Sequence, residues 1–88
     1  KTLENLIKLA RERKITPVEG SYTNKLLTDK SLSKAKILEE IDELIEAIEK
    51  DTNKIHEAAD VFYHLLIYLE SNNVKIEDVM VELENRKK

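Results

Sequence analysis

Apolar residues recur every three or four positions along most of this chain, which is the spacing of one helix face. Strand-like alternation appears nowhere over a useful length, so the sequence predicts an all-α fold, a helical bundle of four to five helices. The predicted helices cover residues 2–13, 21–27, 31–50, 52–71 and 76–85, followed by a frayed basic tail over 86–88. Candidate N-terminal caps are Thr2, Ser21 or Thr23, Ser31 or Ser33, and Thr52 or Asn53.

The predicted helix over 31–50 is strongly amphipathic. At about 100° per residue, six apolar side chains fall within an arc of roughly 120°: Ile37, Leu38, Ile41, Leu44, Ile45 and Ile48. Glu39 and Glu43 lie nearly opposite this arc, whereas Glu40 lies nearer its edge. We therefore expect Glu40 to be the half-buried acid of this helix.

The helix that follows is apolar on nearly every side, so we expect it at the centre of the assembly. Glu57, Asp60 and His64 form a single polar strip along it. An ionised acid on a central helix is costly unless it is paired or binds a metal. We interpret His64 as a core-edge histidine hydrogen-bonded to the Asp60 carboxylate, in preference to a catalytic residue. In the last helix, Ile76, Val79, Met80 and Leu83 are expected to face inward.

The acids of the two long helices form an EExxE pattern, Glu39–Glu40–Glu43, and an ExxD pattern, Glu57–Asp60. Residues three or four apart share a helix face, so two packed helices bring both sets together. Converging carboxylates repel one another unless a cation lies between them, and such hard oxygen ligands suit Mg²⁺ or Mn²⁺. A glutamate-rich face is usually just solvated, but that does not explain acids on an apolar helix. The sequence therefore predicts a metal site.

Five acids are more than one Mg²⁺ requires. Three explanations stay open: two ions bind, one acid acts as a base on a water, or a lysine offsets the excess charge. Lys36 lies three residues before Glu39 on the same helix face and suits the last role.

The chain has 88 residues, which predicts one domain over 1–88. Its net charge of −3 argues against a nucleic-acid or anionic-membrane partner. Because cysteine is absent, thiolate metal sites and a cysteine nucleophile are excluded, and a reducing, cytoplasmic location is expected.

The segment PVEGSYTNKLL, residues 17–27, offers the hydroxyls of Ser21 and Thr23 beside a helix N-terminus, together with the positive charge of Lys25. Such an arrangement is a natural anion site. An ordinary capped helix explains the same residues.

These motifs together resemble the all-α nucleoside triphosphate pyrophosphohydrolases, the MazG-like superfamily, whose members bind Mg²⁺ through such acids. Within it, EGSYTNKLL, residues 36–43 and EAADVFYHLLIYL resemble the phosphoribosyl-ATP pyrophosphohydrolase family of histidine biosynthesis. Leu38, where the family often has glycine, and Lys75, where a capping serine is usual, depart from it. The resemblance implies that Glu40, Glu43, Glu57 and Asp60 hold the metal, that Glu39 lies close by, and that Lys25 and Lys36 lie near phosphates.

The function that the resemblance implies is Mg²⁺-dependent hydrolysis of phosphoribosyl-ATP to phosphoribosyl-AMP and pyrophosphate, without a fused cyclohydrolase domain. Glu39 or Glu40 would orient or deprotonate the attacking water. Two alternatives stay open: a related enzyme that acts on a free NTP or dNTP, and a helical dimerisation module whose acids are only a solvated surface.

A chain this short is poorly placed to cover an apolar central helix alone. We therefore expect a homodimer, or a higher even oligomer, that packs the two long helices against their copies. Leu65, Leu66 and Leu69 are candidates for that interface.

Overall fold

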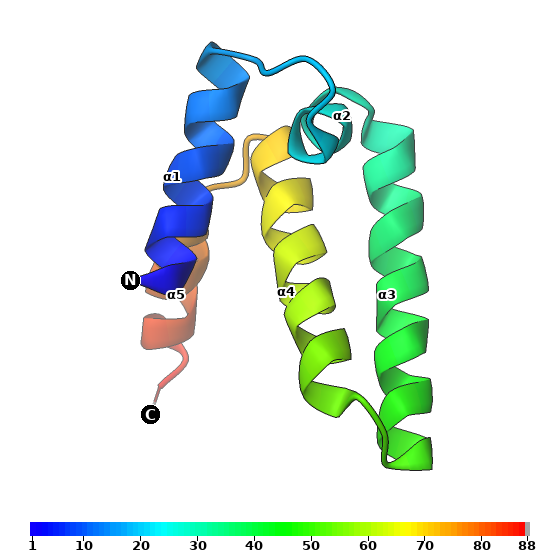
Figure 1. Ribbon diagram of the computed structural model, residues 1–88. Helices are drawn as coiled ribbons and strands as arrows, with labels where there is room; N and C mark the ends of the chain where they lie inside the picture. The colour runs from blue at the N-terminus through cyan, green and yellow to red at the C-terminus, as the bar shows by residue number, and fades with distance from the viewer. Residues whose placement is uncertain (88) are drawn as a thin grey trace.

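The computed structural model describes residues 1–87, which form five α-helices and no β-strand, so the all-α prediction is confirmed. The helices are α1 (Thr2–Ile15), α2 (Tyr22–Thr28), α3 (Lys30–Lys50), α4 (Lys54–Ser71) and α5 (Ile76–Asn85). Figure 1 shows α3 and α4 side by side, with the short α2 lying across one end of the pair and α1 on the far side of α4. The pair α3–α4 is the frame on which the rest is placed.

Side-chain caps explain where α2 and α3 begin. Ser21 caps α2 as predicted, since its hydroxyl accepts a hydrogen bond from the Asn24 backbone N–H. Asp29 ends α2 and caps α3 by accepting from the Leu32 N–H at 3.0 Å, so the prediction of Ser31 or Ser33 is wrong. The reason is that Ser33 lies inside α3 and is buried.

The caps predicted for α1 and α4 make no such hydrogen bond. Lys1, not Thr2, precedes α1, and no side chain caps it. Asn53 occupies the predicted N-cap position of α4, but it adopts a left-handed backbone conformation (φ 50°) and its side chain makes no cap bond. The turn from α3 into α4 is therefore shaped by backbone conformation, with Asp51 also left-handed.

The hydrophobic core lies where α1, α2 and α4 meet. Ala10, Leu26, Leu27 and Ile67 form its buried centre, and Leu6, Leu32 and Tyr63 pack against them. Ile67 and Leu26 are fully buried, which places α4 at the centre of the fold as predicted.

The buried face of α3 is rotated away from its predicted apolar arc. Ser33, Ile37, Glu40 and Ala47 are buried, whereas Leu38, Ile41, Ile45 and Ile48 are exposed. Glu40 is only 7% exposed, so its expected position at the edge of the buried face is confirmed, and it is deeper than half-buried. The most apolar stripe of α3 thus faces outward. On α4, Leu65 is exposed too, but Leu66 is buried within this chain.

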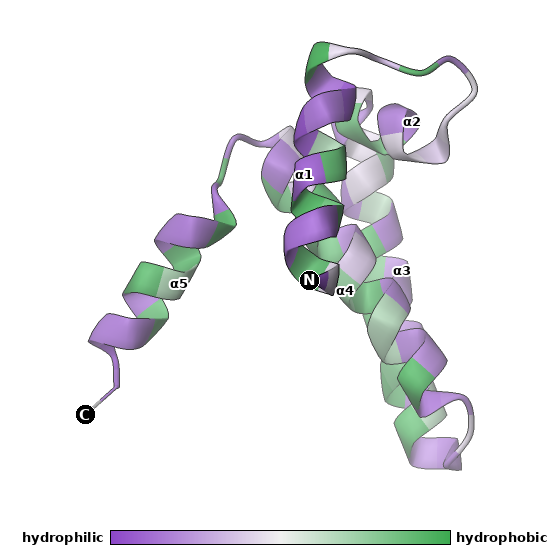
Figure 2. Cartoon of the chain, turned by 60° about the vertical axis from the view of Figure 1, so that its left-hand side comes forward, coloured by the Kyte–Doolittle hydropathy of each residue, from purple (hydrophilic) through white to green (hydrophobic). Residues whose placement is uncertain are grey.

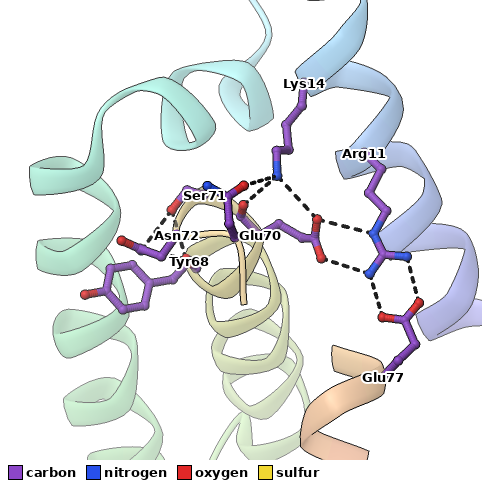
Figure 3. A network of polar contacts seen from close by, with 8 residues as sticks. Arg11, Lys14, Tyr68, Glu70, Ser71, Asn72 and Glu77 are labelled. Atoms are coloured by element: carbon purple, nitrogen blue, oxygen red, sulfur yellow. Dashed lines mark hydrogen bonds and ion pairs between the residues drawn. The ribbon is translucent and has the colours of Figure 1, made fainter. Parts of the chain in front are cut away.

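α5 does not pack as predicted. None of its ten residues, all of them described, is buried, and Met80 and Leu83 are more than half exposed. Figure 2 shows α5 projecting away from the other helices. The contacts that hold α5 are polar instead: Arg11 of α1 binds the Glu77 carboxylate at 2.6 and 2.8 Å and the buried Glu70 at the end of α4 (Figure 3).

The predicted frayed tail over 86–88 reaches Lys88, which lies outside the described residues, while Arg86 pairs with Glu82 at 2.9 Å. Among residues 1–87, no helix is long and apolar enough to cross a membrane.

Candidate active site

Three carboxylates from the two long helices converge. Glu40 and Glu43 lie one turn apart on α3, and Glu57 lies in the first turn of α4. Each offers an oxygen atom, and these oxygens all lie within 4.8 Å of one another. The antiparallel packing of α3 on α4 therefore brings together part of the EExxE pattern and the first acid of the ExxD pattern. We call these three residues, together with Asp60, the carboxylate cluster.

Asp60 belongs to a second group that shares Glu57. His56, Glu57 and Asp60 also offer ligand atoms within 4.8 Å of one another, and His56 Nε2 lies 3.4 Å from Asp60 Oδ2. His56, in the first turn of α4, is not among the predicted site residues. The spacing of four residues between His56 and Asp60 is the feature from which their contact was predictable.

Burial leaves two oxygens of the cluster without a partner. Glu40 Oε2 and Glu57 Oε2 are buried and accept no hydrogen bond within residues 1–87. The pKa of Glu40 is raised to about 7 by a hydrogen bond with the Glu43 carboxyl, by burial, and by the charges of Glu43 and Asp60. Unpartnered buried carboxylate oxygens are costly, and a divalent cation bound by hard oxygen ligands would satisfy them. The residues present therefore fit a Mg²⁺-type ion.

Lys36 lies beside the cluster as predicted. Its ammonium group lies 3.3 Å from Glu39 and 4.0 Å from Glu40. The pKa of Lys36 is raised, mainly by its hydrogen bond to Glu39, so the lysine is charged at neutral pH. Glu39 itself is exposed at the rim, whereas Glu40 points into the helix pair.

The predicted phosphate-binding residues around α2 face different surroundings. Lys25 is exposed and, with Gly20, Ser21 and Tyr22, lines an open groove of about 600 Å³. The Ser21 hydroxyl accepts a hydrogen bond from Arg13 at 2.6 Å as well as capping α2. Thr23, by contrast, is buried, and its hydroxyl lies 2.6 Å from the Tyr63 hydroxyl. A substrate contact by any of these residues stays a prediction.

His64 is buried at the core edge, as interpreted, but its partner differs from the prediction. His64 Nδ1 lies 2.8 Å from the backbone carbonyl of Asp60, not from its carboxylate, and Nε2 lies 3.0 Å from the Tyr22 hydroxyl. On a helix, a side chain at position i+4 can reach the carbonyl of residue i as easily as its side chain, so spacing alone did not decide between them. Tyr22 is not among the predicted site residues.

An all-α helix pair with converging carboxylates fits the class of all-α nucleoside triphosphate pyrophosphohydrolases. Comparison with known proteins gives the family: the sequence matches phosphoribosyl-ATP pyrophosphohydrolase over residues 3–87. The chain belongs to the phosphoribosyl-ATP pyrophosphohydrolase family.

Individual relatives agree with this assignment. A phosphoribosyl-ATP pyrophosphatase from Clostridium acetobutylicum is 44% identical over 89 residues, covering 96% of this chain and 79% of that protein. One from Methylobacterium nodulans is 41% identical over 97% of this chain and 82% of that protein. The histidine biosynthesis bifunctional protein HisIE of Pyrococcus furiosus is 44% identical over 98% of this chain, which spans 41% of its length.

Proposed function

We propose that this protein hydrolyses phosphoribosyl-ATP to phosphoribosyl-AMP and pyrophosphate with the help of Mg²⁺, as a step of histidine biosynthesis. The observation that carries the proposal is the carboxylate cluster with its unpartnered buried oxygens, in a chain of this family. The relatives are named for this substrate, whereas a solvated acidic surface would not bury Glu40. A cytoplasmic location stays a prediction.

In this proposal, Glu40, Glu43 and Glu57 hold the cation, with Asp60 beside them and linked through Glu57. When bound, the cation offsets the negative charge of the triphosphate and acidifies a water ligand. Mn²⁺ would satisfy the same oxygen donors. The chain would provide the rest of the chemistry through its own side chains.

The proton and the phosphates would be handled by residues in and around the carboxylate cluster. Glu39 or Glu40 would accept the proton of the attacking water: Glu39 is the accessible one, and Glu40 is the one within the cluster. Lys36, within 4.0 Å of both acids, would balance their charge and face the phosphate chain. Lys25 and Ser21, in the groove beside α2, would bind the far part of the substrate.

We also propose that two copies of the chain form the active enzyme. The exposed stripe of Leu38, Ile41, Ile45 and Ile48 on α3, with Phe62 and Leu65 on α4, is an apolar surface that a monomer would leave in water. Such a surface is typical of an interface between subunits. A two-fold axis beside α3 and α4 would bury both copies of it and place one carboxylate cluster on each side.

A substrate panel tests the proposed activity. Release of pyrophosphate would be measured with phosphoribosyl-ATP, the common NTPs and the dNTPs, each with Mg²⁺ and with a chelator. We expect Mg²⁺-dependent release from phosphoribosyl-ATP with the highest kcat/KM of the panel. A preference for a free NTP or dNTP would reassign the substrate within the same superfamily. The absence of release from every nucleotide would leave the helical dimerisation module as the function.

A further inference from the structure

Two consecutive residues of α2 are hydrogen-bonded to two consecutive residues of α4. The Tyr22 hydroxyl lies 3.0 Å from His64 Nε2, and the Thr23 hydroxyl lies 2.6 Å from the Tyr63 hydroxyl. His64 in turn reaches the Asp60 backbone carbonyl at 2.8 Å. A helix of seven residues has little stability of its own, so these contacts fix the position of α2 on α4. They connect the groove segment directly to the turn of α4 that carries Asp60.

The chemistry of these atoms decides which way the hydrogen bonds run. A backbone carbonyl can only accept, so Nδ1 of neutral His64 carries the ring proton. Nε2 is then an acceptor, and the Tyr22 hydroxyl donates to it. The bridge is thus a directed chain from Tyr22 through His64 to the Asp60 carbonyl, and each member has the partner it requires.

The three aromatic rings restrict Tyr22 further. Tyr22 and Tyr63 stack with ring centres 6.5 Å apart and planes 15° apart. His64 meets both edge-on, at 5.9 Å from Tyr22 and 5.0 Å from Tyr63. Such packing holds ring planes as well as positions. A loss of the Tyr22 hydroxyl would therefore remove the hydrogen bond and leave the ring in place.

Tyr22 stands between the two halves of the proposed active site. It lines the groove that also contains Ser21 and Lys25. On its other side it is close enough to Lys36, Glu40 and Glu39 for their charges to act on its phenol, while burial raises its pKa. The residue that the bridge positions thus lines the groove, and its phenol also feels the charges of Glu39 and Glu40.

We propose that Tyr22 and His64 are positioning residues for the hydrolysis. Their hydrogen bond sets the segment from Ser21 to Lys25 at a fixed place relative to the carboxylate cluster, so that phosphates bound by the segment align with the cluster. This inference rests on the proposed function, because it assigns the segment to substrate and the cluster to the cation. The bridge acts on the alignment of the substrate and leaves cation binding unchanged.

Substitutions at both ends of the hydrogen bond test the proposal. Tyr22→Phe removes the hydroxyl and keeps the ring. His64→Asn keeps an amide near the position of Nδ1 and loses the contact to Tyr22, whereas His64→Gln places an amide near Nε2 and can accept from Tyr22. We expect Tyr22→Phe and His64→Asn each to lower kcat/KM about fivefold to tenfold, the factor expected for one hydrogen bond, and His64→Gln to restore most of it. The variant that carries both Tyr22→Phe and His64→Asn should have a kcat/KM no lower than that of the less active single variant. The reason is that both substitutions remove the same hydrogen bond.

Two further measurements separate positioning from a merely structural role. Titration with Mg²⁺ should give the same affinity in all variants, and nitrogen NMR of His64 should show the Nδ1–H tautomer in the wild type and a shifted Nε2 signal in Tyr22→Phe. Tyr68→Phe is the matched control, because Tyr68 is half-buried on α4 and its hydroxyl has no hydrogen bond within residues 1–87. It should retain wild-type kinetics.

The outcomes are distinct. The positioning role would be overturned if the two single losses in kcat/KM add up in the double variant. It would also be overturned if the losses in kcat/KM follow the fall in thermal midpoint across all variants, including Tyr68→Phe. The single and double variants are compared with the nucleotide that gives the highest kcat/KM in the substrate panel. A wild type that prefers another nucleotide therefore contradicts the proposed substrate alone, and one that is inactive on every nucleotide contradicts both proposals.

Discussion

The Glu40 carboxyl lies between two packed helices, and one of its oxygens has no partner within the described part of the chain. The hydrogen bond with Glu43, burial, and the charges of Glu43 and Asp60 together raise its pKa to about 7. A carboxyl in this state is protonated in the metal-free protein below neutrality and must lose its proton to bind a cation. Cation binding at the cluster should therefore strengthen as the pH rises through about 7.

The pH dependence of stability follows from that pKa. In the unfolded chain Glu40 ionises near its usual 4.5, whereas in the folded chain it ionises near 7. Protonated Glu40 therefore adds its full contribution to the free energy of unfolding below about pH 4.5. This stabilisation is lost as the pH rises through 7. In a chelator, Glu40→Gln should be no more stable than wild type at about pH 5 and clearly more stable at about pH 8, as urea unfolding would measure. An equal difference at both pH values would contradict the raised pKa.

The same carboxyl shows what sequence can predict at the scale of a residue. Helical geometry placed Glu40 at the edge of the buried face, because angular position depends only on spacing. The Asp60 carbonyl as the partner of His64, and Asp29 as the cap of α3, were not predictable in this way. In each case a second group within one helical turn could have made the same hydrogen bond: the Asp60 carboxylate to His64, and Ser31 or Ser33 as the cap of α3. Only the path of the backbone decides between such groups.

At the scale of the element, the end of α4 is the point where three helices meet. Glu70 is 5% exposed and accepts from Arg11 at 3.1 and 3.3 Å, while Lys14 donates to its backbone carbonyl at 2.8 Å and lies 3.7 Å from its carboxylate (Figure 3). Arg11 extends the network to Glu77 of α5, and these bonds hold the pKa of Glu77 down at about 2. The network ties α1 and α5 to the central helix.

The two ends of this network should respond differently to the loss of a charge. Glu70→Gln removes the buried negative charge that pairs with Arg11 and Lys14 and should lower the free energy of unfolding by about 1–3 kcal/mol. Glu77→Gln changes an exposed carboxylate, so it should leave the unfolding midpoint nearly unchanged and instead speed hydrogen exchange in α5. Urea unfolding and amide hydrogen exchange would be measured for both variants. Equal destabilisation by Glu70→Gln and Glu77→Gln would contradict this expectation.

The ranges of the helices were largely predictable from periodicity, whereas the orientation of α5 was not. The apolar pattern of Ile76, Val79, Met80 and Leu83 correctly indicated a helix with one apolar face. It did not indicate what covers that face, because a pattern carries no information about the partner surface. The same limit explains α3, whose most apolar stripe faces away from α4.

At the scale of the whole molecule, the outward stripe of α3 and the exposed Phe62 of α4 support the proposed dimer. Ile45→Glu would place a charge in the middle of that interface and should give a single chain mass by sedimentation, together with a loss of activity. Ile15→Glu changes an isoleucine of α1 that is 83% exposed and should leave both properties as in wild type. A fully active wild type with a single chain mass at micromolar concentration would contradict the proposed dimer.

Substitutions on α3 can show whether the carboxylate cluster is the catalytic cation site. Mg²⁺-dependent release of pyrophosphate from phosphoribosyl-ATP is measured for wild type, Glu43→Gln and the control Glu49→Gln, which changes an exposed glutamate on the same helix. We expect Glu43→Gln to lose activity by at least about a hundredfold with unchanged helicity, because it removes a charged ligand, and Glu49→Gln to match the wild type. Full Mg²⁺-dependent turnover by Glu43→Gln would contradict the site.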